Sequence, residues 1–416
     1  MFNTIDEVYN YLYNQKKTAP RENLDRITRC ANLLNIKANY KKIHVAGTNG
    51  KGSTCQYIKE MLALKNLHVG MFVSPFVISF NERIRINDRY ISDSEIMHYM
   101  NILYDFNQKY EKEYNDHLPF FELTLLMALM WFSDRNIDIA IIECGLGGLL
   151  DSTNFLDYDL AIITNIGFDH MAQLGNTLEK IASHKLGIAK PNMVCLTTVS
   201  DNLKDYFINY AKSNNVDMRF ITDISNISVS DKTYFEYKNH KYKSNLLGEY
   251  QAYNASLAIE AVRYFDNEYP NTLIEFALEN VKWPGRMEVL NQKPLILLDG
   301  AHNIHAINAI SDTLSKLKGN KKIKTIFSAL QDKEYPSMIK RLEDITDYFY
   351  FTKIIDLRQI EDIHFEKYTN KQYEINNDFK SCLEEAISNL KENEILLITG
   401  SLHFVSQIRE YYYKKH

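Results

Sequence analysis

The spacing of apolar and polar residues along the chain predicts an α/β protein. Short, continuous apolar runs with polar ends are typical of parallel strands that are covered on both faces. An apolar lead-in at Ile43 and Val45 enters a glycine-rich bend, and further strands are expected at 68–74, 138–144, 159–165 and 193–199. Residues 81–87 are charged and are predicted to be extended.

Helical periodicity separates these strands. It predicts two amphipathic helices within residues 5–34, broken near Pro20, and a central apolar helix at 121–135. A helix at 93–115 is expected to be capped by Asp93, because an aspartate side chain accepts backbone hydrogen bonds at a helix start. Further helices are predicted at 54–65, 177–189, 251–265 and 272–280.

A second alternating unit begins near residue 295. Its strands are predicted at 295–299, 323–329, 348–352 and 395–399, with helices between them, as in a smaller Rossmann-like domain. Residues 219–242 instead show short alternating segments with polar turns, which predict a small antiparallel β subdomain. We therefore expect a P-loop ATPase-type parallel-sheet domain at 1–283, a Pro-Gly hinge at 284–288 and the Rossmann-like domain at 289–416.

The length of 416 residues fits two or three domains, and the net charge of −5 provides no long-range attraction for nucleic acid or acidic membranes. The five cysteines show no paired spacing, which favours a reducing cytosol over a disulfide framework. The most apolar stretch, residues 123–132, is about half as long as a membrane span. We therefore expect a cytoplasmic protein without nucleic-acid or membrane partners.

The bend at residues 44–53, with the sequence HVAGTNGKGS, joins a predicted strand to a predicted helix. Glycines let backbone N–H groups approach phosphate oxygens, the following helix presents its positive N-terminus, and Lys51 can reach terminal phosphates. The stretch departs from the G-x-x-x-x-G-K-[ST] motif, since Val45 replaces the first glycine and Gly52 follows the lysine. The alternative is an ordinary glycine-rich turn from strand to helix.

Polar residues that follow buried strands are candidates for a site at the carboxyl edge of the sheet. Glu143 closes an apolar strand and is either a ligand for a hard cation such as magnesium or a solvated, capping carboxylate. His170 is either a second ligand beside the same crevice or a polar loop residue. The phosphate loop on this edge favours the metal-binding interpretation of Glu143.

Lys185 lies on an otherwise apolar helical stripe made by Leu178, Ile181, Ala182, Ile188 and Ala189. Either it reaches solvent from the edge of this stripe, or it is a buried and unusually reactive amine. The spacing alone leaves both interpretations open.

Polar residues also follow two predicted strands of the second unit. Asp299, in the sequence DGAHN, and Ser401 are expected to face the crevice between the domains, although Asp-Gly and Gly-Ser are also common turn formers. Arg286 at the hinge is either solvated or placed to reach a nucleotide phosphate when the domains close.

Several motifs occur in an order that one protein family shares. They are VAGTNGKGS at 45–53, SP at 74–75, NERI at 81–84, ECGLGGLLDSTN at 143–154, TNIGFDH through HKLGIAK over 164–190, PGR at 284–286, DGAHN at 299–303 and TGSL at 399–402. Together they resemble the folylpolyglutamate synthase/dihydrofolate synthase family of the Mur ligase superfamily, over nearly the whole chain. Gly-Lys-Gly-Ser at 50–53, in place of the Gly-Lys-Thr-Thr of cell-wall Mur ligases, favours this folate branch of the superfamily.

The resemblance implies an ATP-dependent ligase that adds L-glutamate to the γ-carboxylate of a reduced folate through an acyl phosphate. It implies that the ATP phosphates are held by Gly47, Thr48, Asn49, Gly50, Lys51, Gly52 and Ser53. Further nucleotide contacts are implied for Asn254, Arg286 and Asp299. We expect a monomer whose partners are the reduced folate, L-glutamate and ATP.

The same resemblance implies two magnesium sites and a set of catalytic residues. One ion would be held by Ser74 and Glu143, and the second by Glu143, His170 and Lys185, with Lys185 carried as a carbamate. The catalytic residues would be Lys185, Asp299, His302 and Ser401, with His302 and Ser401 on the glutamate side.

Some residues depart from the pattern of family members that also make dihydrofolate from dihydropteroate. The departures are Phe76, Leu149, Ser152, Tyr250 and Ile304. Phe76 and Ser152 favour a folylpolyglutamate synthase without dihydrofolate synthase activity, and Leu149 removes a cation near the substrates. The alternatives are a bifunctional enzyme that also uses dihydropteroate and a non-catalytic nucleotide-binding paralogue.

Overall fold

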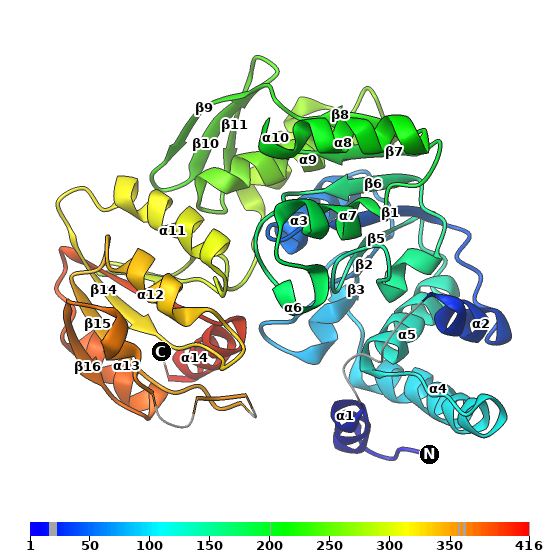
Figure 1. The fold of residues 1–416 in the computed structure, drawn as a ribbon, viewed down its shortest axis with the longest axis horizontal. Coiled ribbons are helices and arrows are strands. Elements are labelled where there is room, and N and C mark those ends of the chain that lie inside the picture. The colour runs from blue at the N-terminus through cyan, green and yellow to red at the C-terminus, as the bar shows by residue number, and fades with distance from the viewer. Residues whose placement is uncertain (16–22, 200, 357, 361–362, 416) are drawn as a thin grey trace. The chain divides into compact units, whose positions relative to one another are not determined.

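The chain forms two units whose β-sheets are separate (Figure 1). The computed structural model describes residues 1–15, 23–199, 201–356, 358–360 and 363–415. Unit 1 comprises Met1–Ile166, His170–Thr222 and Leu257–Ile274, and unit 2 comprises Gly167–Asp169, Asp223–Ser256 and Glu275–His416. The α/β class expected from the sequence is confirmed.

The described strands of unit 1 form one sheet in the order β4-β3-β2-β5-β1-β6-β7-β8. Their bounds are β1 Lys41–Ala46, β2 Val69–Phe72, β3 Ile84–Ile86, β4 Arg89–Tyr90, β5 Ile139–Glu143, β6 Leu160–Ile163, β7 Val194–Thr197 and β8 Asp217–Phe220. Neighbours from β2 to β8 pair in parallel, whereas β3 and β4 are antiparallel. Every residue of β5, β6 and β7 is buried, as the continuous apolar runs predicted.

Helices of unit 1 cover this sheet. They are α1 Ile5–Asn14, α2 Asp25–Leu33, α3 Lys51–Ala63, α4 Asp93–Tyr114, α5 Phe120–Asp134, α6 Met171–Leu174, α7 Leu178–Leu186 and α8 Asp201–Asn214. Figure 1 shows α4 and α5 lying side by side. The predicted apolar helix is α5, and it is buried on nearly all sides because apolar residues occupy every face of it.

Three local predictions for unit 1 were wrong or incomplete. The cap of α4 is Ser92, whose side chain accepts from the Glu95 N–H while the Glu95 carboxylate accepts from the Ser92 N–H, so Asp93 is the first helical residue. Residues 81–87 are not wholly extended, since the 3₁₀ helix η1 Phe80–Arg83 precedes β3. The prediction also missed α8 and β8, and the predicted break near Pro20 lies outside the described residues.

The antiparallel ribbon is a three-stranded sheet in the order β11-β10-β9, with β9 Ile224–Val229, β10 Thr233–Tyr237 and β11 His240–Ser244. It groups with unit 2, although the sequence placed it in the N-terminal domain. Side-chain contacts connect it to α10: His240 Nε2 lies 2.6 Å from Glu275 Oε1, and Lys243 forms an ion pair with Glu279 at 3.0 Å. The boundaries expected from the sequence, an N-terminal domain that ends at residue 283 and a C-terminal domain that begins at residue 289, stay a prediction.

The larger sheet of unit 2 has the order β12-β13-β17-β14-β15-β16. Its strands are β12 Glu288–Gln292, β13 Leu295–Leu298, β14 Lys322–Phe327, β15 Tyr348–Phe351, β16 Gln372–Ile375 and β17 Glu394–Thr399. All neighbours pair in parallel except β12, which is antiparallel to β13. The prediction missed the two edge strands, β12 and β16, because neither contains a buried residue or a continuous apolar run.

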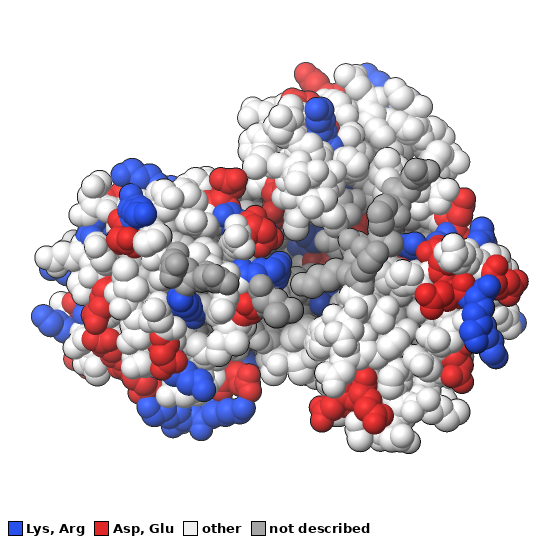
Figure 2. All heavy atoms as spheres, turned by 60° about the horizontal axis from the view of Figure 1, so that its bottom comes forward, with Lys and Arg blue, Asp and Glu red and all other residues white. Residues whose placement is uncertain are grey.

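The remaining helices are α9 Glu249–Phe265, α10 Asn271–Asn280, α11 Ile304–Leu317, α12 Tyr335–Leu342, α13 Phe379–Ser388 and α14 Leu402–Lys415. None of the helices in the described part of the chain is both long and apolar enough to cross a bilayer. On the face shown in Figure 2, acidic and basic side chains are mixed, so this face has no extended patch of basic residues.

Candidate active site

The glycine-rich bend joins β1 to α3 as predicted, and α3 begins at Lys51. Gly50 caps this helix in the left-handed conformation, with φ of 82°. Gly47 approaches the end of β6 so closely that an added Cβ would lie 1.8 Å from Thr164 Oγ1. Glycine is therefore required at position 47 for this backbone path.

The end of β6 holds the bend in shape. The backbone N–H of Thr48 donates to the Asn165 carbonyl at 3.0 Å, and the N–H of Asn49 donates to Asn165 Oδ1 at 2.9 Å. Thr164 Oγ1 donates to the Asn49 carbonyl at 2.6 Å. The loop is thus preorganised by residues more than 110 positions away in sequence.

Lys51, Ser74 and Glu143 meet at the carboxyl edge of this sheet. Lys51 Nζ donates to the carbonyls of Gly47 at 3.1 Å and Thr48 at 3.3 Å, and it lies 4.0 Å from Glu143 Oε1. The Ser74 N–H donates to Glu143 Oε2 at 3.2 Å. Glu143 is only 4% exposed, so the interpretation as a solvated strand end is wrong.

Lys185 is buried, as one of its two interpretations required. It lies on α7 with 3% of its surface exposed, and its Nζ donates to the Gly47 carbonyl at 3.0 Å. Its amine is therefore in contact with the phosphate loop rather than with solvent. Whether Lys185 is carbamylated stays a prediction.

His170 has an exposed side chain and a left-handed backbone, with φ of 51°, immediately before α6. Among the described residues, no group of three or more His, Cys, Asp or Glu side chains is arranged to hold a metal ion. The donors at the loop, a buried carboxylate and a serine, suit one hard cation that takes further oxygens from phosphate and water. The second site, which needs His170 and a modified Lys185, stays a prediction.

In unit 2, Asp299 follows β13 and orders the turn around it. Its Oδ2 accepts from the Met287 N–H and its Oδ1 from the Ala301 N–H, both at 2.8 Å. Burial raises the pKa of Asp299 above its ordinary value. The charge of Arg286 and these two hydrogen bonds act in the opposite direction but do not outweigh burial. Asp299 is therefore a turn residue as well as a buried carboxylate beside Arg286.

His302 lies in the same turn. Its Nδ1 is 2.9 Å from the Gly300 carbonyl, which can only accept, so Nδ1 carries the proton and Nε2 has its lone pair. Desolvation, followed by the charge of Lys333, lowers the pKa of His302 to about 4. The imidazole is therefore neutral at pH 7.

Lys333 and Asp169 were not singled out by the sequence. Lys333 Nζ is 3.4 Å from Asp169 Oδ1, Asn303 Nδ2 donates to Asp169 Oδ2 at 3.0 Å, and His302 Nε2 is 3.8 Å from the same oxygen. Lys333 follows β14 after a short loop, so the rule on carboxyl ends of strands would have found it.

Asn254 and Ser401 are buried, at 4% and 2% exposure. Asn254 Nδ2 donates to Gln251 Oε1 at 3.0 Å on α9, and Ser401 directly precedes α14. Arg286 Nη1 donates to the Gly285 carbonyl at 3.1 Å and lies close to Gly300. The structure thus brings Arg286, Asp299 and His302 together, whereas no contact between described residues joins Asn254 to them.

Two departures from the family pattern, Ser152 and Leu149, lie in different surroundings. Ser152 Oγ donates to Glu122 Oε1 at 2.9 Å, and Glu122 is also bound by Arg26. Leu149 is 47% exposed and takes no part in the core.

Comparison with known proteins agrees with this architecture. The family model described as the Mur ligase middle domain matches residues 45–262, and that of the Mur ligase glutamate ligase domain matches residues 285–402. The chain is 32% identical to the dihydrofolate synthase/folylpolyglutamate synthase of Bacillus subtilis, over 99% of both chains. It is 29% identical to the folylpolyglutamate synthase of Lacticaseibacillus casei, over 97% of both.

Solved structures share the fold. Folylpolyglutamate synthase from Thermotoga maritima has a TM-score of 0.85 at 28% identity, over 99% of this chain and 97% of that one. FolC from E. coli in complex with DHPP and ADP has a TM-score of 0.89 at 24% identity, over 99% and 98%. This chain belongs to the Mur ligase family, in its branch of folylpolyglutamate and dihydrofolate synthases.

Proposed function

We propose that this protein is an ATP-dependent ligase that adds L-glutamate to the γ-carboxylate of reduced folates. The observation that carries the proposal is the pairing of Lys51 with the buried Glu143 at the phosphate loop, in a chain of this family. A carboxylate oxygen of the folate attacks the γ-phosphorus of ATP and displaces ADP. The glutamate amine then attacks the acyl carbon, displaces phosphate and loses a proton.

The phosphate loop holds the ATP phosphates in this proposal. Lys51 and the backbone N–H groups at the start of α3 stabilise the negative charge that develops on the transferred phosphoryl group. The hydrogen bonds that the loop makes with Asn165 and Thr164 support this role, because a preorganised loop does not reorganise when charge appears. Gly47, Thr48, Asn49, Gly50, Gly52 and Ser53 complete the loop.

Magnesium, when bound, would supply positive charge to the phosphate oxygens. Ser74 and Glu143 would hold one ion, and Glu143, His170 and Lys185 a second. A manganese ion accompanies AMPPNP and L-glutamate in one related bifunctional synthase. Carbamylation would turn the buried Lys185 amine into an oxygen ligand, and this would add a second anionic donor beside Glu143.

Residues of unit 2 act on the nucleotide and on the incoming glutamate. Asn254, Arg286 and Asp299 contact the nucleotide in this proposal, and His302 and Ser401 serve the glutamate side. A neutral imidazole suits this role, since the lone pair on His302 Nε2 can accept the proton that the amine loses.

The direct test is product formation. Purified protein with ATP, magnesium, tetrahydrofolate and radiolabelled glutamate should yield folate diglutamate and ADP. Glu143→Ala should abolish the product, and Glu179→Ala, an exposed position on α7, serves as the control. Absence of product with every reduced folate would contradict the proposal and favour a nucleotide-binding paralogue.

Dihydrofolate synthase activity is the second candidate. It is favoured by the full-length similarity to the Bacillus subtilis protein, whose name includes both activities. The same assay with dihydropteroate in place of tetrahydrofolate separates a bifunctional enzyme from one restricted to folates.

A further inference from the structure

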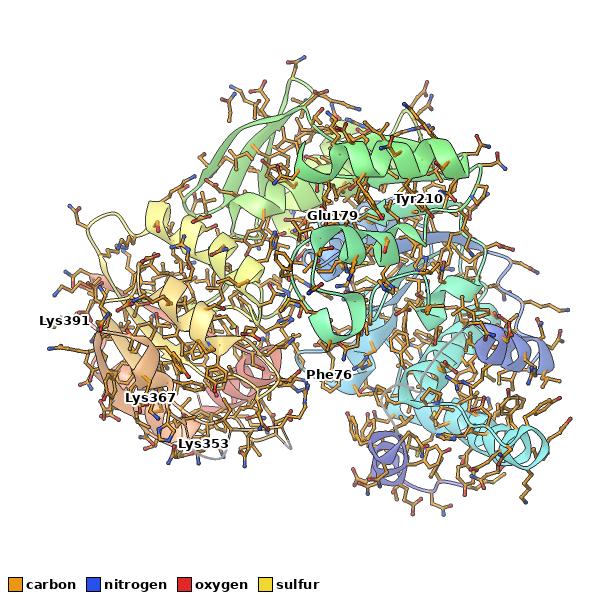
Figure 3. The ribbon with its side chains drawn as sticks, in the orientation of Figure 1. Phe76, Glu179, Tyr210, Lys353, Lys367 and Lys391 are labelled. Atoms are coloured by element: carbon orange, nitrogen blue, oxygen red, sulfur yellow. The ribbon has the colours of Figure 1, made fainter. Side chains whose placement is uncertain are left out.

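Three phenyl rings enclose the guanidinium of Arg83, the last residue of η1. Its Cζ lies 5.3 Å from the ring centre of Phe76, 5.9 Å from that of Phe80 and 5.3 Å from that of Phe120. We call these three rings the aromatic cage. Phe76, labelled in Figure 3, belongs to the segment between β2 and η1, and Phe120 begins α5. Arg83 is 8% exposed and its Nε is fully buried, so most of this side chain is removed from water.

The guanidinium of Arg83 is unpaired within the part of the chain that the structure describes. Among the described residues, no hydrogen bond or ion pair is made by its side chain, and Nε is buried without an acceptor. Two other arginines of unit 1 are paired: Arg26, whose side chain is 14% exposed, binds Glu122, and the buried Arg85 binds Gln56. An arginine carries five N–H donors, and a buried charge is costly unless it is paired.

The cage alone does not compensate for this burial. Cation–π contacts stabilise a guanidinium from its faces, but its N–H groups lie in its plane and still need acceptors. In agreement, burial lowers the pKa of Arg83 to about 10, so the cation is retained at neutral pH in an unfavourable environment. An anionic group from outside the chain would satisfy it.

Arg83 lies beside the residues that we assign to phosphoryl transfer. The Val73 N–H donates to the Arg83 carbonyl at 2.9 Å, and the next residue, Ser74, donates to Glu143 Oε2. The charge of Glu143 also acts on Arg83. A ligand group held by Arg83 would therefore lie near the carboxylate that ATP activates.

We propose that Arg83 binds the α-carboxylate of the glutamyl residue whose γ-carboxylate is extended. The inference rests on the proposed ligase function. The α-carboxylate stays anionic throughout the reaction and lies only a few bonds from the reacting group. A guanidinium in a dry environment binds a carboxylate through two parallel hydrogen bonds.

The proposal makes Arg83 a specificity-determining residue. Dihydropteroate has a single carboxylate, which is the one that reacts, so it offers no second anion to Arg83. Arg83 thus strengthens the binding of folates that already carry glutamate and leaves dihydropteroate binding nearly unaffected.

Equilibrium binding tests this without turnover. We would measure the Kd of tetrahydrofolate and of its α-carboxamide analogue, with magnesium and a non-hydrolysable ATP analogue present. The wild-type protein should bind the carboxamide about 10- to 100-fold more weakly, as expected for loss of a hydrogen bond between charged groups. Equal affinities for the two ligands would overturn the proposal, whether or not any variant folds.

The substitution Arg83→Gln assigns the effect to this residue. The variant should bind tetrahydrofolate and its α-carboxamide analogue equally. Its affinity for dihydropteroate should be that of the wild-type protein. Arg85→Gln removes a buried arginine two residues away and should keep the full preference. A preference retained in Arg83→Gln, or an equal loss of dihydropteroate binding, would show that the side chain is structural. If the wild-type protein prefers the carboxylate ligand but forms no ligated product, the result counts against the ligase function and not against the role of Arg83.

Discussion

The amino groups of Lys51 and Lys185 donate to one backbone carbonyl, that of Gly47, at 3.1 and 3.0 Å. Lys51 begins α3, and Lys185 lies on α7, 138 positions after Gly47 in the sequence. Two ammonium groups that share an acceptor repel each other at short range. Carbamylation of Lys185 would replace this repulsion by attraction and would explain why a lysine is buried here.

Lys185 should therefore carry a carbamate under carbon dioxide. Incubation with ¹³C-bicarbonate should give a carbamate signal in the NMR spectrum of the wild-type protein and none in Lys185→Met. Ligation by Lys185→Met should fall at least about 100-fold, as for loss of a charged group at a transition state. Lys180→Met, at an exposed position on the same helix, should retain both the signal and the activity. A wild-type protein without the signal, yet fully active, would contradict this prediction.

Gly47→Ala should destabilise the phosphate loop. The added methyl group would meet Thr164 Oγ1 at 1.8 Å, so the strand or the loop must move. We expect a loss of about 1–3 kcal/mol in the free energy of unfolding, measured by urea titration, and weaker ATP binding. Gly319→Ala has no atom within 4 Å of the new methyl group and should leave ATP binding unchanged. In the Thr164→Ala background, Gly47→Ala should cost less stability than in the wild-type protein. If the double variant instead loses the sum of the two single losses, the clash with Thr164 is not the cause.

His302 should set the acid limit of glutamate use. The neutral imidazole predominates above its pKa of about 4, so kcat/KM for glutamate should fall only as the pH drops through about 4. An unperturbed histidine would give a limit near pH 6.5 instead. His302→Gln should lower kcat/KM for glutamate by about 100-fold or more without changing the Kd of ATP. His364→Gln, exposed and distant in sequence, is the matched control.

Glu95 should govern the acid stability of unit 1. Burial raises its pKa, but hydrogen bonds from the Ser92 N–H, Trp131 Nε1 and Arg135 outweigh this effect and lower the pKa from 4.5 to about 2. Because the folded-state pKa is depressed, this stabilisation is complete above pH 4.5 and is lost as the pH falls through about 2.

The variant Glu95→Gln should lower the free energy of unfolding by about 1–3 kcal/mol at pH 7 and flatten its decline between pH 4.5 and 2. Thermal unfolding followed by circular dichroism over this range would measure both effects. Glu111→Gln, exposed on the same helix, should change neither. An unchanged pH dependence in Glu95→Gln would rule out this carboxylate as the cause.

The sequence by itself determined the local architecture of the site. Glycine and lysine spacing predicted a strand, loop and helix at residues 44–65, and the carboxyl-end rule brought Ser74 and Glu143 to the same edge. Helical periodicity placed Lys185 on the apolar stripe of its helix. These features depend on neighbours within one or two turns or on sheet order, which a sequence pattern reports directly.

Only the tertiary structure decided which groups meet across the fold. Residues from separate elements meet in three places. They are the hydrogen bond between Asn165 and the phosphate loop, the Gly47 carbonyl that accepts from two lysines, and the aromatic cage around Arg83. The grouping of the antiparallel sheet with unit 2 also depends on packing rather than on chain order. Such contacts arise from how side chains fill the space between elements. The spacing of residues along the chain does not report which side chains lie close together in space.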